Sequence, residues 1–381
     1  MPAVTQVQAV DTVRDPGAAT PNTVDADLTR SIESALAAFL AARRPDTAAV
    51  DRQFAEATRA LNEFVLTGGK RIRPTFAWWG WRGAGGLPDS PEAPAVIRAI
   101  SALELVQACA LIHDDLMDSS ATRRGRPTVH IEFAARHRSA GWRGQPDRFG
   151  EAAAILLGDL AMCWADDMLR GAGLPADALR RMAQPWDAMR TEVLGGQYLD
   201  VLHQATGDGT EHAALQINRY KTAAYTVERP LHLGAAIAGA GPDLVDAYRR
   251  FGADVGVAFQ LRDDMLGVFG DPDVTGKPAG DDLREGKHTL LLACATKRAE
   301  AAGDRAALAV LGQAVGNLDL QPDELDRARD VLLELGAVRA VEQRIAELTE
   351  AGLDALIGAP IAAPAGDRLA ELAIAATRRA R

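Results

Sequence analysis

Two acidic clusters, each at the end of an apolar helical run, place the strongest constraint on this chain. The first lies in Ile112–Asp118, written IHDDLMD, and the second in Gln260–Asp264, written QLRDD. On an α-helix, residues i and i+4 are displaced by only about 40° around the axis, so Asp114 and Asp118 share a face and Asp115 points elsewhere. Carboxylates that face the same interior as a buried apolar stripe need metal ions or basic groups to neutralise them. The clusters therefore predict a charged site inside a helical protein.

Most of the chain carries the pattern of amphipathic helices. The composition is 48% hydrophobic but only 5% aromatic, and alternating runs of β-branched residues are missing, so the signal for strands is poor. We expect one long internal loop, at 134–149, which is either a lid or a tolerated insertion. The fold is predicted to be all-α, with helices over about 25–40, 50–66, 90–119, 150–171, 176–205, 211–239, 243–269, 285–302, 322–335, 337–357 and 366–380.

Composition also limits the class of protein. Residues 1–24 have no periodic pattern and predict a disordered tail, whereas no Pro/Gly/Ser-rich linker divides 25–381. A formal net charge of −10 argues against general nucleic-acid binding, which needs a basic surface. The three cysteines lack disulfide or metal-ligand spacing, and neither a signal sequence nor a membrane-spanning segment is recognisable. We expect one soluble, cytoplasmic domain after a short tail.

A basic segment, Gly68–Pro74, written GGKRIRP, places three cations beside two glycines. Backbone amides and side chains can converge there on one anion, and diphosphate fits that description. A solvated basic turn after a helix end would explain this segment if it stood alone. A second cationic segment, Thr122–Pro127, follows the first acidic cluster directly. Its position favours a shared phosphate ligand over simple ion pairing.

Further cations accompany the second acidic cluster. Lys277 and Lys287 lie in the glycine-rich connection that follows it, and Lys221-Thr222 interrupts an otherwise apolar helical stretch. Each of these residues alone is explained as an ordinary surface charge. Their joint occurrence predicts that lysines cap the diphosphate from the side opposite the metal ions.

Taken together and in this order, the motifs resemble those of the trans-isoprenyl diphosphate synthases, the polyprenyl synthetase family. They are Gly-Gly-Lys-Arg-x-Arg-Pro, Asp-Asp-x-x-Asp with a following Arg-Arg-Gly, Lys-Thr, and Phe-Gln-x-x-Asp-Asp with two downstream lysines, within about residues 28–300. The chain looks most like actinobacterial geranylgeranyl diphosphate synthases. The resemblance implies a single-domain helical bundle around a central cavity over 25–381 and a homodimer. It also implies a prenyltransferase that condenses isopentenyl diphosphate with dimethylallyl, geranyl or farnesyl diphosphate.

The resemblance also implies a role for each matching residue. Asp114, Asp118 and Asp263 would bind three Mg²⁺ ions, and Asp114 and Asp263 would assist ionisation of the allylic diphosphate together with Lys221 and Lys277. Mg²⁺ accepts one or two carboxylates plus phosphate oxygens and water, which suits so sparse a set. The residues expected to hold the allylic diphosphate are Arg123, Lys221, Thr222, Gln260, Lys277 and Lys287. Those expected to hold isopentenyl diphosphate are Lys70, Arg73, Gln107 and Arg124, and those expected to support the metals, directly or through water, are Asp115, Asp264 and Asp281.

Two positions depart from the family pattern. Gly267 stands where many members carry a third aspartate of the second cluster, although the aspartate usually credited with the metal contact is kept as Asp263. Gln107 stands where members commonly have a histidine, and its amide can still donate a hydrogen bond but cannot carry a positive charge. Neither change implies loss of substrate or metal binding.

The charges suggest a mechanism and the helix geometry suggests a product length. Metal ions and lysines would stabilise the leaving diphosphate, the allylic C–O bond would ionise, and the double bond of isopentenyl diphosphate would attack the cation. Cys109 and Ala110 lie about 6 to 7.5 Å down the helix axis from Asp114, where the growing tail should run. Because both are small, we expect elongation past C15 to mainly C20. Asp200, in a polar patch on an apolar helix, is equally well explained as a support for the carbocation or lid and as a structural hydrogen-bond partner.

Two alternatives remain open at this point. A class I terpene synthase also ionises prenyl diphosphates at an aspartate-rich helix, but it would not need Lys70, Arg73 and Arg124. A non-catalytic subunit of a heteromeric prenyl synthase would not need intact metal aspartates. Product formation by the purified chain discriminates between these alternatives.

Overall fold

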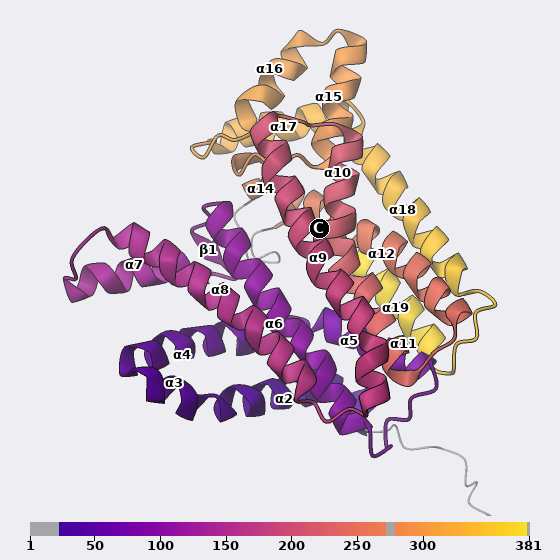
Figure 1. Ribbon diagram of the computed structural model, residues 1–381. Coiled ribbons are helices and arrows are strands. Elements are labelled where there is room, and N and C mark those ends of the chain that lie inside the picture. The colour runs from indigo at the N-terminus through magenta and orange to yellow at the C-terminus, as the bar shows by residue number, and fades with distance from the viewer. Residues whose placement is uncertain (1–22, 272–278, 379–381) are drawn as a thin grey trace, which may run out of the picture.

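The computed structural model describes residues 23–271 and 279–378 of the chain. Lys277 therefore lies outside the described residues, as does the predicted tail apart from Thr23 and Val24, which begin the first helix. Within the described part the elements are helices and one pair of short strands, β1 Thr122–Arg123 and β2 Arg126–Pro127 (Figure 1). The prediction of an all-α fold is confirmed.

From Thr23 on, where the described part begins, five helices precede the central helix: α1 Thr23–Ala26, α2 Leu28–Ala42, α3 Arg44–Val50, α4 Arg52–Leu66 and α5 Ile72–Gly83. The i, i+4, i+8 stripe of Ile32, Leu36 and Leu40 buries α2, which packs against the central helix. Complete burial of each such side chain contributes about 1.5–3 kcal/mol. Asp25 accepts a hydrogen bond from Trp78 Nε1 at 2.8 Å, which ties α1 to α5. The start of the described chain is thereby fixed to the body.

The central helix, α6 Ala93–Met117, ends at the first acidic cluster. Its mean hydropathy of 1.8 over an 18-residue window is high enough for a membrane span, and among the described residues it alone passes this test. However, 78% of that window is buried inside the protein, as in the core helix of a folded domain. Because α6 is covered almost all around, its last turn delivers Asp114 and Asp118 to the interior.

The prediction of a long loop over 134–149 is wrong. Helix α7 spans Val129–Ala140 and α8 spans Pro146–Arg170, so a short turn connects two helices that project from the body (Figure 1). The rings of Phe133, His137, Trp142 and Phe149 form an aromatic cluster with centroid separations between 5.1 and 6.4 Å. Aromatic pairs of this kind contribute about 0.5–1.5 kcal/mol each. The charged residues and glycines of this segment favoured the prediction of a loop, although its aromatic residues form a local core between two helices.

The helices that follow are α9 Ala176–Thr206, α10 Glu211–Ile217, the π-helix η1 Asn218–Glu228, α11 Arg229–Ala238 and α12 Pro242–Phe269. The sequence predicted one helix over 211–239, whereas the structure has three segments with η1 in the middle. π-Helices are rare in proteins, and many of those that occur lie at functional sites. Two glycines admit it: a Cβ on Gly196 of α9 would lie 2.2 Å from Lys221 N, and one on Gly256 of α12 would lie 2.7 Å from Ala223 Cα. The lysine of η1 is thus pressed against α9.

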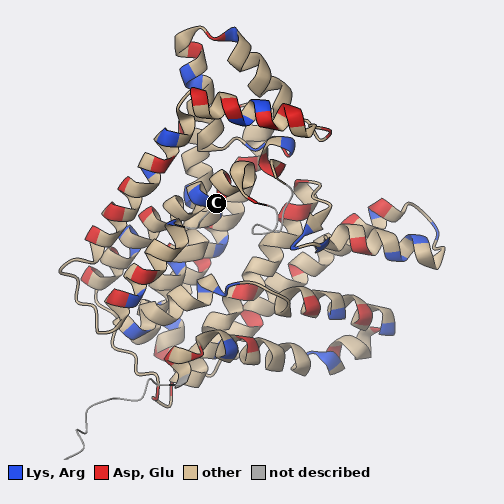
Figure 2. Ribbon diagram, turned by 180° about the vertical axis from the view of Figure 1, so that it is seen from behind, with Lys and Arg blue, Asp and Glu red and all other residues tan. Residues whose placement is uncertain are grey.

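The remaining helices are α14 Asp281–Arg284, α15 Leu290–Ala302, α16 Arg305–Ala314, α17 Pro322–Glu334, α18 Ala337–Leu356 and α19 Ala365–Thr377. The helix predicted over 285–302 begins later, at Leu290, and α16 was not predicted. With the second half of α12, α14–α18 enclose a second apolar core beside the one around α6. Figure 2 shows both acidic and basic residues on the outer helices. α12 therefore joins both cores, and its carboxyl end carries the second acidic cluster.

Candidate active site

A short hairpin folds back on the end of α6. Its turn residues Arg124 and Gly125 both have positive φ, 52° and 71°, as a type I′ turn requires. The hairpin directs Arg123 to Asp115, where Nε and Nη2 lie 2.7 and 2.6 Å from Oδ1. The Asp115 side chain is only 1% exposed. Asp115 therefore anchors Arg123, as expected from its position off the face of Asp114.

Lys221 joins the first acidic cluster to α9. Its Nζ lies 2.7 Å from Asp114 Oδ1 and 2.5 Å from Asp200 Oδ2. Burial would lower the pKa of Lys221, but Asp114 and Asp200 outweigh burial and raise this pKa above its usual value. Burial would likewise raise the pKa of Asp114, whereas Lys221 and Lys287 hold it well below its usual range. Asp114 is therefore ionised at neutral pH and ready to bind a cation.

Lys287 joins the end of α6 to the connection that follows α12. Its Nζ lies 2.7 Å from Glu285 Oε2, 3.4 Å from Asp118 Oδ2 and 3.5 Å from Asp282 Oδ1. One ammonium group thus faces three carboxylates. Burial and the neighbouring Asp114 raise the pKa of Asp118 to about 6 in spite of Lys287. The negative charge around Asp118 is incompletely neutralised.

The second acidic cluster has one exposed and one buried carboxylate. Asp263 is exposed, whereas Asp264 is buried and accepts hydrogen bonds from Gln260 Nε2 at 2.6 Å and Asn218 Nδ2 at 3.5 Å. Burial and then the nearby Asp282 raise the pKa of Asp264 to about 7. Gln260, expected at the allylic diphosphate, here donates its amide to Asp264.

The structure explains why position 267, where many family members carry an aspartate, is a glycine in this chain. A Cβ on Gly267 would lie 1.9 Å from Asp282 Oδ2 and 2.4 Å from Asp282 Cγ. The carboxyl group of Asp282, from α14, therefore occupies the space in which a side chain at 267 would begin. Gly280 N also donates to Gly267 O at 3.0 Å, which holds α14 against α12. The carboxylate at this point of the site comes from α14 instead of α12.

Basic residues gather on the other side of the end of α6, between α4, α5 and the β-hairpin. The buried guanidinium of Arg73 stacks over the ring of Tyr225 at 4.0 Å, and Lys70 is exposed at the start of this region. Arg124 and Gln107 line one small cavity of about 10 Å³. The two cationic segments predicted from the sequence thus lie side by side. They offer fixed positive charges next to the carboxylates.

The residues expected to set product length lie one turn before Asp114. Cys109 is buried and Ala110 half-buried, and burial raises the pKa of the Cys109 thiol to about 12. A thiol with so high a pKa is unreactive. His113 turns away toward α8, with Nε2 3.2 Å from Ile155 O. It therefore takes no part in the carboxylate cluster.

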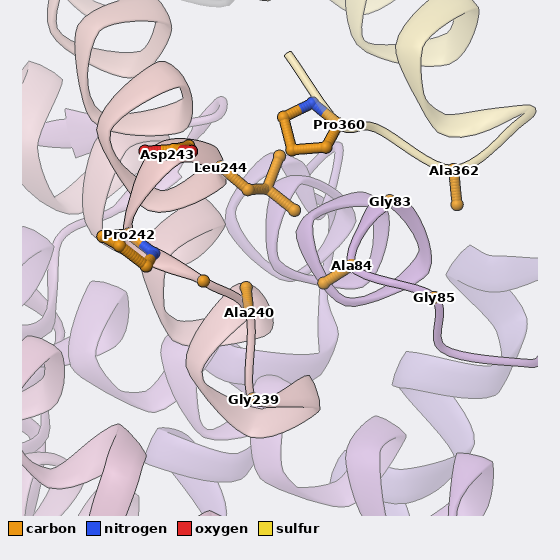
Figure 3. A pocket seen from close by; sticks show the side chains of 11 residues that line it. Gly83, Ala84, Gly85, Gly239, Ala240, Pro242, Asp243, Leu244, Pro360 and Ala362 are labelled. Carbon is orange, nitrogen blue, oxygen red and sulfur yellow. The ribbon is translucent and has the colours of Figure 1, made fainter.

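A separate cavity of about 420 Å³ lies far from these charges (Figure 3). It is lined by the end of α5 at Gly83, the start of α12 at Asp243, and the segment around Pro360. Asp243 precedes Asp263 by 20 residues on the same helix, which places them roughly 30 Å apart along its axis. Glycine, alanine and proline dominate this lining, so it does not belong to the charged site.

The carboxylates suit Mg²⁺ bound together with a phosphate ligand. The raised pKa values of Asp118 and Asp264 mark negative charge that a divalent cation would relieve. In the described part of the chain, no three His, Cys, Asp or Glu side chains converge closely enough to hold an ion unaided. Mg²⁺ typically takes one or two carboxylates and completes its shell with water and phosphate oxygens. The donor set therefore fits this ion.

A family model for polyprenyl synthetases matches residues 55–324. The chain belongs to the polyprenyl synthetase family. It is accordingly a trans-prenyltransferase, and its family is one of magnesium-dependent prenyl synthases. The resemblance drawn from the motifs is confirmed.

Relatives agree on the chemistry but differ in product. The chain is 34% identical over 299 residues to a geranylfarnesyl diphosphate synthase of Aeropyrum pernix, covering 78% of this chain and 85% of the relative. It is 35% identical over 273 residues to a (2E,6E)-farnesyl diphosphate synthase of Mycobacterium bovis, covering 71% and 68%. A crystal structure of geranylgeranyl pyrophosphate synthase from Corynebacterium glutamicum, complexed with isoprenyl diphosphate and magnesium, is 46% identical, with a TM-score of 0.89 over 92% of this chain and 98% of that one. Because the named products differ, the product length of this chain has to be inferred from its own residues.

The structure brings together most of the residues predicted for the site. Asp114, Asp118, Arg123, Lys221 and Lys287 meet through the contacts above, while Thr222 is half-buried on η1 and Asp281 opens α14. Sequence reasoning missed Asp282 and Glu285 as partners of Lys287, although Asp282 follows Asp281 directly and Glu285 lies two residues before Lys287. It left the role of Asp200 open, and the structure pairs Asp200 with Lys221.

Proposed function

We propose that this enzyme makes (all-E)-geranylgeranyl diphosphate from isopentenyl diphosphate and dimethylallyl, geranyl or farnesyl diphosphate. The observation that carries the proposal is the meeting of a carboxylate cluster and a basic cluster at the end of α6. Lys221 and Lys287 border the first, and Arg73 and Arg124 belong to the second. Two anionic substrates could thus bind side by side, one through metal ions on the carboxylates and the other through the basic side chains.

In this proposal Asp114, Asp118 and Asp263 hold three Mg²⁺ ions against the allylic diphosphate. When bound, the metal ions act as Lewis acids that stabilise the leaving diphosphate. The matching residues Arg123, Lys221, Thr222, Gln260, Lys277 and Lys287 complete the contacts to that group. Asp115, Asp264 and Asp281 support the ligands, and Asp115 does so by fixing Arg123.

Lys70, Arg73, Gln107 and Arg124 hold isopentenyl diphosphate through direct contacts. Arg73 is well suited because its stacking on Tyr225 and its hydrogen bond to Thr226 Oγ1 at 3.0 Å fix the guanidinium plane before substrate arrives. Once the allylic C–O bond has broken, the double bond of isopentenyl diphosphate attacks the carbocation. The released diphosphate takes up the proton lost in the last step.

A C20 product is supported by the small side chains one turn before Asp114. Cys109 and Ala110 leave room at the depth where a C15 chain would end. The test is Cys109→Phe, for which we expect a shift from geranylgeranyl to shorter products by mass spectrometry. Val50→Phe, at a 71% exposed position at the end of α3, is the control and should leave the distribution unchanged. An unaltered product in Cys109→Phe would contradict this placement of the tail.

A homodimer is supported by exposed apolar residues on α8 and α9. Ile155 and Leu156 of α8 are 47% and 68% exposed, and Leu194 and Tyr198 of α9 are 57% and 67% exposed. Large apolar side chains grouped in this way are typical of an interface that a second copy covers. A cytoplasmic location agrees with three free cysteines. Sedimentation of the wild type and of Leu156→Glu would test the dimer.

The experiment that tests the function is incubation of the purified protein with Mg²⁺, isopentenyl diphosphate and each allylic starter in turn. Geranylgeraniol after dephosphorylation is the expected product. Products of another length would keep the reaction and overturn the C20 assignment. Release of hydrocarbon without elongation would identify a terpene synthase, and a lack of product would identify a subunit that needs a partner chain.

A further inference from the structure

A buried ion pair lies beneath the basic cluster and has no part in the chemistry above. Arg71 Nη1 lies 2.7 Å from Glu104 Oε2, and the two side chains are 2% and 3% exposed. Glu104 is on α6, ten residues before Asp114, and Arg71 is in the connection between α4 and α5. The pair therefore links the central helix to the segment that carries Lys70 and Arg73.

Arg71 holds its own segment in an unusual conformation. Its φ of 51° lies in the left-handed region, which residues with a Cβ rarely adopt without support. The support is visible, because its guanidinium also donates to Val65 O at 3.0 Å and Leu66 O at 3.3 Å at the end of α4. Gly68 and Gly69 precede it with φ of 72° and 96°. The path of this turn, and hence the position of Lys70, depends on where the guanidinium of Arg71 is held.

Glu104 is also placed to act on the charge of the cluster. It pairs with Arg71, as does Glu33 of α2, whose Oε1 lies 3.5 Å from Arg71 Nε, and it lines the same small cavity as Arg124 and Gln107. Burial and the neighbouring Arg123, Arg71 and Arg73 lower the pKa of Arg124, while Glu104 acts in the opposite sense. Glu104 Oε1 is buried and has no hydrogen-bond partner among the described residues. Glu104 therefore binds Arg71 through Oε2, while Oε1 makes no hydrogen bond to the described residues.

We propose that Glu104 is a positioning residue for the isopentenyl diphosphate site, acting through Arg71. It fixes the left-handed turn from which Lys70 and Arg73 reach the substrate and makes no contact with the substrate itself. The proposal rests on the assignment of Lys70, Arg73 and Arg124 to isopentenyl diphosphate. It leaves the allylic diphosphate, held by metal ions, Lys221 and Lys287, unaffected.

A purely structural pair would behave differently, and steady-state kinetics separate the two roles. For Glu104→Gln we expect the KM for isopentenyl diphosphate to rise about tenfold, the effect of one misplaced charged contact, with kcat and the KM for farnesyl diphosphate within about twofold. Glu104→Asp, which keeps the charge, should recover part of the loss. Equal changes in both KM values, or a fall in thermal stability alone, would overturn the proposal.

Glu192→Gln is the matched control. Glu192 of α9 pairs with the buried Arg229 of α11, with Oε2 2.8 Å from Arg229 Nε, and within the described residues it forms no ion pair with Lys70, Arg71, Arg73 or Arg124. The same chemical change there should leave both KM values in place. If Glu104→Gln fails to fold, the double variant Arg71→Gln/Glu104→Gln, which removes both buried charges together, takes its place. A normal KM for isopentenyl diphosphate in that variant would also overturn the proposal.

Failure of the substrate assignment would look different from failure of this inference. Arg73→Gln should raise the KM for isopentenyl diphosphate whether or not Glu104 matters. If Arg73→Gln and Glu104→Gln both leave that KM unchanged, the site assignment is wrong. If only Arg73→Gln raises it, the assignment stands and the role of Glu104 is refuted.

Discussion

The two sides of the α6 end carry opposite balances of charge. The acidic half has more carboxylates than cations: Asp114, Asp118, Asp200, Asp263, Asp264, Asp282 and Glu285 against Arg123, Lys221 and Lys287. The basic half has the reverse: Lys70, Arg71, Arg73 and Arg124 against Glu33 and Glu104. An anion approaching the acidic half needs divalent cations as intermediaries, whereas one approaching the basic half does not. We expect this difference to distinguish the two diphosphates of the proposed reaction.

The largest effect should follow loss of a carboxylate that binds metal. Asp114→Ala and Asp263→Ala should each lower kcat by about a thousandfold, because the leaving diphosphate loses its stabilisation. Product formation over a range of Mg²⁺ concentrations measures this. Asp177→Ala, at an exposed site on α9, is the control and should match the wild type. Full activity in Asp114→Ala would remove the acidic half from the chemistry.

Next in size is the loss of the lysine that links η1 to the acidic half. Lys221→Gln should lower kcat about a hundredfold, because the ammonium group stabilises the departing oxygens. Asp200→Asn should cost only about tenfold, since Lys221 remains but is less firmly held. The double variant should be no worse than Lys221→Gln, because Asp200 acts through the lysine. Additive losses in the double variant would show that Asp200 has an independent role.

The basic half should respond in KM and not in kcat. Arg73→Gln should raise the KM for isopentenyl diphosphate about 10- to 100-fold, as expected for a lost charge-assisted contact, and leave that for farnesyl diphosphate unchanged. Arg73→Lys should restore little, because an ammonium cannot both stack on Tyr225 and donate to Thr226 as the guanidinium does. Initial rates with each substrate varied separately measure both constants. An equal rise in the KM for isopentenyl diphosphate and the KM for farnesyl diphosphate would show that the two halves do not bind different substrates.

The smallest effect concerns the pH dependence of stability without metal. Because the pKa of Asp264 is raised to about 7, the folded state holds this proton where the unfolded state has released it. Its contribution to stability is therefore present at low pH and lost as pH rises from about 4 to 7. The stability of Asp264→Asn relative to wild type should increase by about 1 kcal/mol per pH unit over that range, measured by urea unfolding. A constant difference between pH 5 and 8 would contradict this.

Periodicity predicted the parts of this molecule that local sequence determines. Asp114 and Asp118 share a face because of the helical repeat, and the structure keeps them at the buried end of α6. The helix α5 was missed because its Trp-rich sequence is buried on nearly every side and shows no amphipathic period. Helix α8 was predicted over 150–171, but α7 and its packing against α8 were missed because their aromatic core is assembled across the turn. Both errors arise where burial comes from tertiary contacts.

The pairings inside the site depended on the same long-range contacts. Lys221 and Asp200 are close because Gly196 admits a π-helix against α9, and no local pattern announces a π-helix. Asp282 takes the place of a side chain at Gly267 only because α14 returns to α12. The motifs predicted the candidate site residues, whereas the contacts among them depend on how the helices pack.

Calorimetric titration of each substrate alone, with and without Mg²⁺, tests the division into two halves most directly. Isopentenyl diphosphate should bind with a Kd that changes less than about threefold on adding EDTA, because its contacts are side-chain cations. Farnesyl diphosphate should lose about a hundredfold or more in affinity, because the carboxylates cannot hold it without metal ions. Equal dependence of both substrates on Mg²⁺ would contradict the account.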